Sequence, residues 1–114
     1  MTVELVDIGI LSVGDVDVFA IDYTPYLDAS ETLASVSTPV ELTSTDLTFA
    51  NVAVNAAAVV IKGVTVAIGK AVQFKVSGQQ LDSGSPKLYR VKVTAITNSS
   101  PARTKVVNVK FRCI

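Results

Sequence analysis

The last third of this sequence alternates apolar and polar residues, and this pattern constrains the fold more than any other feature. Residues 71–77, 87–97 and 107–112 each place an apolar side chain at nearly every second position. A period of two sends alternate side chains to opposite faces of a β-strand, whereas a helix needs a period of about 3.6 residues. We therefore expect three antiparallel strands that share one core face: Val72, Phe74, Tyr89, Val91, Val93, Val107, Val109 and Phe111.

Weaker strand signals precede this region. Turn residues separate three earlier candidate strands, at residues 16–21, 32–40 and 45–54. The first is expected to be buried on both faces at its end, because apolar residues follow one another there. The second is expected to stop near Pro39, which cannot donate to a sheet ladder. In the third, Leu47, Phe49 and Asn51 are expected on one face.

The middle of the chain is its most apolar stretch and leaves two alternatives. Residues 56–61 and 64–68 can form two short strands that meet at a turn through Lys62 and Gly63. A buried helical turn through residues 56–58 is the alternative, because three alanines stand in a row there.

These elements predict one small all-β domain. The length of 114 residues lies near the most common domain size, so residues 1–114 are expected to form a single unit. Many short strands with regular turn signals are typical of an immunoglobulin-like antiparallel β-sandwich, here of about seven strands. Residues 1–13 can be the first strand or an extended arm, because Gly9 and Gly14 permit either.

The charges of the chain are divided between its two halves. Residues 1–61 carry nine acidic and no basic residues, a formal charge of −9. Residues 62–114 carry all ten basic residues and Asp82 alone among the acids, a charge of +9. Opposite charges of this kind can meet within one subunit or between neighbouring copies. The division therefore favours a protein that assembles with partners.

The residue inventory argues against catalysis, metal binding and cofactors. The chain has no histidine, so it lacks an imidazole base and any His-containing metal site. Cys113 stands alone near the end of a strand, where it is expected to be a small hydrophobe. Asp15 and Asp17 lack the further oxygen ligands and the glycine of a calcium loop. We expect no enzyme, no catalytic residues, no metal and no cofactor.

Five basic residues are expected on the outward faces of the last three strands: Lys75, Arg90, Lys92, Lys110 and Arg112. A basic sheet face can bind nucleic acid, but the nearby aromatic residues that would stack on bases are all expected to point inward. An acidic protein surface needs no such stacking residues and is the simpler partner. No nucleic-acid partner is therefore expected. No membrane partner is expected either, because no apolar run reaches the roughly 18 residues that cross a bilayer.

The segment 22–36 is the most distinctive stretch, with Asp22-Tyr23-Thr24-Pro25-Tyr26-Leu27-Asp28 leading to an acidic turn and Leu33-Ala34-Ser35. This order resembles the fiber-tail adaptor proteins of tailed bacteriophages, which are small immunoglobulin-like modules. The patterns at 72–78 and 88–91, and the approach to the last strand at 102–104, match their layout as well. The resemblance covers most of residues 16–112.

The resemblance implies a structural role in a virion. The protein would join tail fibres to the tail or neck, as a homo-oligomer in contact with a tail fibre, a tail or neck ring, or a portal-associated adaptor. It would reach the phage particle after assembly in the host cytoplasm. A capsid decoration protein with the same fold is the alternative. A carbohydrate-binding sandwich is a weaker one, because the chain has no tryptophan for stacking on sugars.

Six residues are candidate contacts with these partners: Tyr23, Tyr26, Asp28, Glu31, Arg90 and Lys92. The two tyrosines have a second interpretation as corner residues of the sandwich, with the hydroxyl bonded to the backbone. We favour this second interpretation for both of them.

Overall fold

The computed structural model describes residues 6–114 and confirms an all-β sandwich. The strands are β1 (Val6–Leu11), β2 (Asp17–Asp22), β3 (Leu33–Val36), β4 (Val40–Glu41), β5 (Thr48–Val54), β6 (Val59–Ile61), β7 (Val64–Val66), β8 (Ala71–Ser77), β9 (Lys87–Thr97) and β10 (Thr104–Cys113). A single 3₁₀ turn, η1 (Thr24–Tyr26), follows β2 in the described part of the chain.

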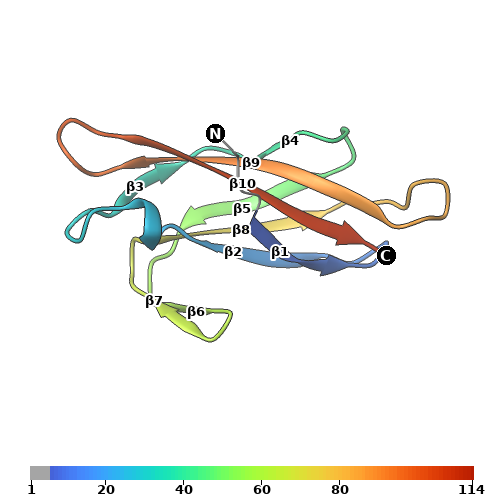
Figure 1. Ribbon diagram of the computed structural model, residues 1–114, viewed down its shortest axis with the longest axis horizontal. Helices are drawn as coiled ribbons and strands as arrows, with labels where there is room; N and C mark the ends of the chain where they lie inside the picture. The colour runs from blue at the N-terminus through green and yellow to red at the C-terminus, as the bar shows by residue number, and fades with distance from the viewer. Residues whose placement is uncertain (1–5) are drawn as a thin grey trace.

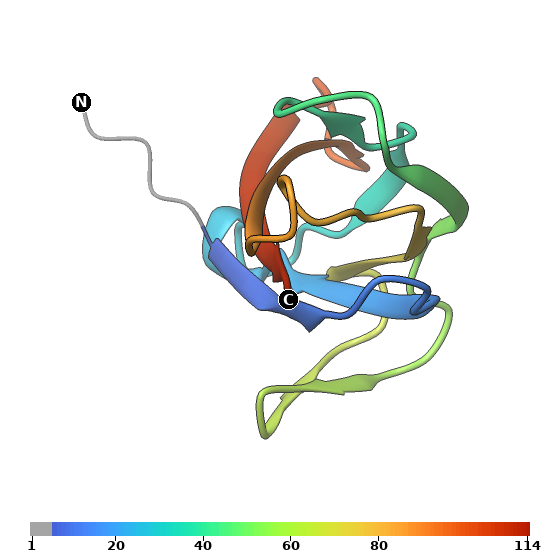
Figure 2. The same ribbon diagram turned by 90° about the vertical axis from the view of Figure 1, so that its right-hand side faces the viewer.

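Two sheets pack face to face (Figure 1). Sheet A has the order β1-β10-β9-β3, with β4 also paired to β9, and sheet B has the order β2-β8-β5. All pairs are antiparallel except that of β1 with β10, which is parallel. Viewed along the strands, the two layers enclose one core, and the β6–β7 hairpin projects away from them (Figure 2). Residues 6–11 of the expected first strand or arm are thus a strand, while residues 1–5 lie outside the described residues.

The expected burial is confirmed, but the three strands do not share one face, because β8 lies in sheet B and faces β9 and β10 across the core. The ladder between β9 and β10 runs from Thr104 opposite Ile96 to Cys113 opposite Lys87 without a register shift. This register places the inward side chains of both strands in matched rows. All eight residues that the alternation predicts are buried: Val72, Phe74, Tyr89, Val91, Val93, Val107, Val109 and Phe111.

A β-bulge in β5 corrects the expected face of that strand. The register against β8 shifts between Ala50 and Ala53, and Asn51 has a φ of 52°. The extra residue moves Val52 and Val54 to the core face, where they pack beside Phe49. Asn51 is exposed, so the prediction that it shares a face with Leu47 and Phe49 was wrong. Asparagine tolerates the left-handed conformation that the bulge requires.

Two other strands differ from their expected form. In β2 the residues Phe19 and Ile21 are buried and Val18 is exposed, whereas Ala20, the outward residue at the end expected to be buried on both faces, is half-buried. The outer edge of this strand forms no ladder with another described strand. The stretch expected as one strand over 32–40 is split into β3 and β4, and eight strands instead of about seven therefore build the two sheets in residues 6–114.

The hairpin of β6 and β7 confirms the expected turn. Lys62 and Gly63 have φ values of 50° and 79°. Positive φ at both central residues is typical of the type I′ turn, whose twist matches that of the flanking strands. No helical turn forms at residues 56–58.

Truncation of the core should be costly. We expect Phe74→Ala to lower the free energy of unfolding by about 3–5 kcal/mol, because the buried ring contacts both Phe19 and Phe49. The matched control is Val106→Ala on the exposed face of β10, which should change it by less than about 0.5 kcal/mol. Urea unfolding measures both, and equal losses would contradict the assignment of the core.

Alanine substitutions at two glycines would distinguish the cost of backbone strain from the cost of steric overlap. Gly78 and Gly84 have nearly equal φ values of 89° and 84°. A Cβ at Gly78 would lie 2.4 Å from the carbonyl oxygen of Asp46, whereas a Cβ at Gly84 meets no atom within 4 Å. We expect Gly84→Ala to cost about 1–2 kcal/mol through backbone strain alone, and Gly78→Ala to cost clearly more in the same urea titration. Equal costs would show that Asp46 does not lie against Gly78.

Candidate interaction surface

The outer face of sheet A carries a cluster of four cations, Arg90, Lys92, Lys110 and Arg112, which we call the cationic face. Because the alternate residues of β9 and β10 fill the core, these side chains must point outward. The ladder places Arg90 directly opposite Lys110. Lys75, the fifth base, lies on the outward side of β8 as expected, but β8 belongs to the other sheet.

None of the four cations forms an ion pair with the side chains that the structure describes. Like charges directly opposite one another on a sheet are destabilising. Arg90 and Lys110 form such a pair, while on its other side Lys110 stands in register with Asp7 of β1. An anionic surface placed against the cationic face would remove this cost.

Exposed apolar side chains lie among these cations. Leu88 stands opposite Arg112 in the ladder, and Ile96 and Val106 lie farther along the same face. A shallow depression of about 210 Å³ opens beside the bulge at Gly9 of β1, between Ile10, Leu88 and the two basic residues of β10. Apolar contact area mixed with cations is suited to a protein partner.

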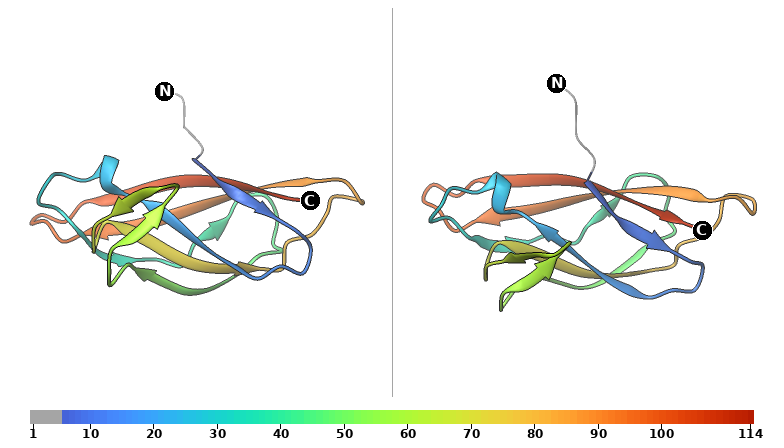
Figure 3. Two further views of the ribbon diagram at one scale, coloured as in Figure 1. Left: turned by 90° about the horizontal axis from the view of Figure 1, so that it is seen from below. Right: turned by 60° about the horizontal axis from the view of Figure 1, so that its bottom comes forward.

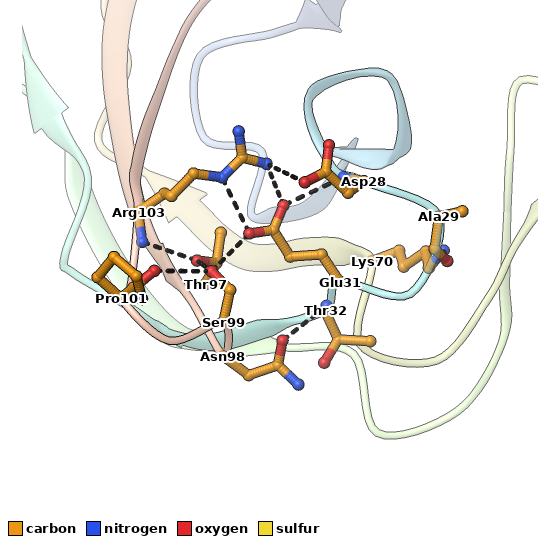
Figure 4. Close-up of polar contacts among 10 residues, drawn as sticks. All are labelled: Asp28, Ala29, Glu31, Thr32, Lys70, Thr97, Asn98, Ser99, Pro101 and Arg103. Carbon is orange, nitrogen blue, oxygen red and sulfur yellow. Dashed lines mark hydrogen bonds and ion pairs between the residues drawn. The ribbon is translucent and has the colours of Figure 1, made fainter.

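At one end of the sandwich, Glu31 and Arg103 join two turns (Figure 4). The guanidinium of Arg103 donates from both Nε and Nη2 to the carboxylate of Glu31, the first bond measuring 3.0 Å. The hydroxyl of Ser99 donates to the same carboxylate at 2.7 Å, and the N–H of Asp28 does so at 3.1 Å. The bonds from Arg103, together with these smaller contributions, hold the pKa of Glu31 well below its usual range.

This arrangement corrects the role expected for Glu31. Its exposed fraction is 4%, so the side chain fastens the turn before β3 to the turn before β10 and is not a surface contact. Asp28 differs, because its carboxylate is largely exposed and lies 3.6 Å from Arg103. Asp28 can therefore contact a partner, whereas Glu31 cannot.

The two tyrosines also differ in their exposure to solvent. Tyr23 is fully buried, and its hydroxyl donates to the carbonyl of Val93 across the sandwich at 3.0 Å. This confirms the core interpretation and rules out a surface contact by Tyr23. Burial raises the pKa of its phenol. Tyr26 packs edge-on against Tyr23 but is 40% exposed, so the favoured interpretation as a packed corner residue was wrong for Tyr26, which can contact a partner.

A second polar cluster closes the opposite end of the β9 strand. The ammonium of Lys87 lies 2.9 Å from Asp46, and the hydroxyl of Tyr89 donates to the same carboxylate at 2.7 Å. These bonds lower the pKa of Asp46, and the carboxylate raises the pKa of Lys87. The N–H of Gln80 in turn donates to the Tyr89 hydroxyl.

Some of the opposite charges of the two halves therefore form ion pairs within the subunit. Each ion pair of the described residues joins an acid of the first half to a base of the second: Asp28 and Glu31 with Arg103, and Asp46 with Lys87. Sequence reasoning did not single out Asp46, Lys87 or Arg103, and the only signal for them was the charge division itself. The predicted contacts Arg90 and Lys92 are exposed together on the cationic face.

Other kinds of site find no counterpart in residues 6–114. No three Asp, Glu or Cys side chains there gather closely enough to hold a metal ion. Cys113 is buried, which raises the pKa of its thiol. The described part also contains no helix long and apolar enough to span a membrane. Comparison of the chain with protein-family models, with curated proteins and with solved structures finds no match.

Removal of the Glu31 charge should make stability less sensitive to acid. A depressed carboxyl pKa contributes stability that is present above the ordinary value of 4.5 and is lost as the pH falls through the folded-state pKa. We expect Glu31→Gln to lower Tm by several degrees at pH 7, with a difference from wild type that narrows below pH 4.5. Asp28→Asn, the exposed neighbour on the same arginine, is the control and should change Tm little. Calorimetry across this pH range measures both, and a constant difference at all pH values would contradict the pairing.

Proposed function

We propose that this chain is a structural protein of a tailed-bacteriophage virion that acts as an adaptor between tail fibres and the tail or neck. The observation that carries the proposal is the cationic face, where four like charges that form no ion pair with a described side chain stand beside exposed apolar side chains. Such a face is unfavourable for an isolated subunit and favourable against an acidic partner. The resemblance of residues 22–36 to fiber-tail adaptors supplies the virion context.

Protein contacts explain this face better than nucleic-acid contacts do. The rings of Phe74, Tyr89 and Phe111 are buried in the core and cannot stack on bases. The apolar outward residues beside the cations are aliphatic, with Leu88 opposite Arg112. We infer that the cationic face binds an acidic protein surface, presented by another virion protein or by the acidic first half of a neighbouring copy in a homo-oligomer.

A capsid decoration protein would use the same fold and the same face, so position in the particle separates the two roles. Electron microscopy of particles labelled with antibody against this chain should place the label at the tail or neck. Label over the whole head would favour decoration, and particles without label would contradict a virion role.

Charge reversal on the cationic face should impair association more than folding. We expect Arg90→Glu or Lys92→Glu to reduce incorporation into particles by about tenfold while Tm changes little, because both side chains are exposed. Lys75→Glu makes the same charge change on the other sheet and is the control, and its Tm is measured as well because Lys75 is half-buried. Incorporation is measured by quantitative immunoblotting of purified particles.

Salt should weaken the same association, since the Debye length falls from about 8 Å at 0.15 M to about 3 Å at 1 M. Equal loss from Lys75→Glu and Arg90→Glu would contradict a specific role of the cationic face.

A further inference from the structure

Strand β2 has an outer backbone edge that pairs with no other strand in residues 6–114. It is an outer strand of sheet B, and among the described strands it pairs with β8 alone. The N–H of Tyr23, the next residue in register, donates to the carbonyl of Lys70 beside β8 at 2.9 Å. Because backbone direction alternates along a strand, Val18, Ala20 and Asp22 turn their N–H and C=O groups away from β8.

These outward groups are not paired with another described strand. Only the N–H of Val18 has a hydrogen bond there, to the carboxylate of the adjacent Asp17 at 2.8 Å. Edge strands are usually protected by a bulge, a proline or an inward charge. The other edge of the same sheet has such a bulge at Asn51 of β5, whereas the ladder of β2 is regular.

A groove of about 560 Å³ runs along this edge. One wall is the β6–β7 hairpin, with Val60 and Val64, and the other includes Ile8 of β1 and Tyr26 of η1. Val60 is 70% exposed, and the neighbouring Val18 and Val64 are also more than half exposed. The groove therefore combines free backbone groups with an apolar lining, and we call it the β2 groove.

The hairpin wall is held in place by one buried side chain. Figure 3 shows the hairpin standing beside β2 and away from the body of the sandwich. The amide nitrogen of Asn55 donates to the carbonyls of Ala57 and Ala67 at 2.9 and 3.0 Å, and its oxygen accepts from the N–H of Ala71 at 3.0 Å. Val66 is buried beneath the hairpin. A lone hairpin is marginal in water, so these bonds give the groove a fixed wall.

We propose that the β2 groove accepts an extended segment of a partner protein, which adds to sheet B as a further strand beside β2. In this mode of recognition, backbone hydrogen bonds supply affinity and pockets for alternate side chains supply specificity. The free groups at Val18, Ala20 and Asp22 would bond the added backbone. The valines of the hairpin would contact every second side chain of the segment.

Charge decides which segment fits. Asp17 and Asp22 stand at the two ends of β2, and Asp15 precedes them. The partner segment should therefore have alternating apolar residues and a basic residue near each end. A second copy of β2 is a poor occupant, because antiparallel pairing would set Asp17 of one copy against Asp22 of the other. Lys62, at the turn of the hairpin, lines the opposite wall.

This inference deepens the proposed adaptor role by naming a docking mode, yet it rests on β2 and the hairpin rather than on the cationic face. The probe is a short synthetic peptide of alternating valine and threonine with a lysine at each end, titrated into the whole chain. We expect saturable binding by NMR and slower hydrogen exchange at the amides of Ala20 and Asp22. A peptide ending in glutamates should bind about tenfold more weakly. A peptide with a central proline should not bind.

Two variants test the groove itself. Val60→Glu places a charge on the groove wall and should abolish peptide binding, whereas Ile68→Glu, at a residue that is also more than half exposed but lies outside the groove, should not. The proposal is overturned if no peptide binds, if lysine and glutamate ends bind equally, or if protection appears away from β2. It is also overturned if the chain dimerises through β2 without peptide. A failure of Arg90→Glu to affect particle incorporation would instead count against the adaptor role alone.

Discussion

The structure depends on the continuous ladder between β9 and β10. Ten matched pairs without a bulge fix which side chains point inward along both strands. Strands β1, β3 and β4 then pair along the two sides of this ribbon, and the inward rows pack against β8 of the other sheet. The same alternation that fills the core leaves Arg90, Lys92, Lys110 and Arg112 no position except the outer face. Core and cationic face are therefore two consequences of one register.

The divided charges of the chain have two distinct uses. Glu31 pairs with Arg103, and Asp46 pairs with Lys87. These two ion pairs hold the turns at the two ends of the sandwich in place. The hydrogen bonds from Arg103 lower the pKa of Glu31 strongly and outweigh its burial, which acts in the opposite direction. The remaining cations of sheet A have no such acid among the described side chains. This asymmetry supports the proposal that part of the charge division serves contacts with other proteins.

The two candidate docking surfaces differ in physics as well as place. The cationic face is a broad, solvated sheet surface whose attraction depends on ionic strength. The β2 groove offers unpaired backbone groups and a fixed apolar wall, and its attraction depends on strand geometry. A connector that holds two partners needs two separable surfaces, and these lie on different sheets. The proposed adaptor role is consistent with such a division.

The sequence alone determined the strands of the last third, their buried residues and the turn at Lys62 and Gly63, because these follow from local alternation and turn chemistry. It also placed Arg90 and Lys92 outward. Tertiary structure decided which acids were bound: Glu31 became buried because a turn about 70 residues away supplies Arg103, and no local pattern records that distance. It also decided the bulge at Asn51, since the extra residue is defined only against β8. The free edge of β2 likewise exists only through its place at the border of sheet B, which depends on pairings between distant segments.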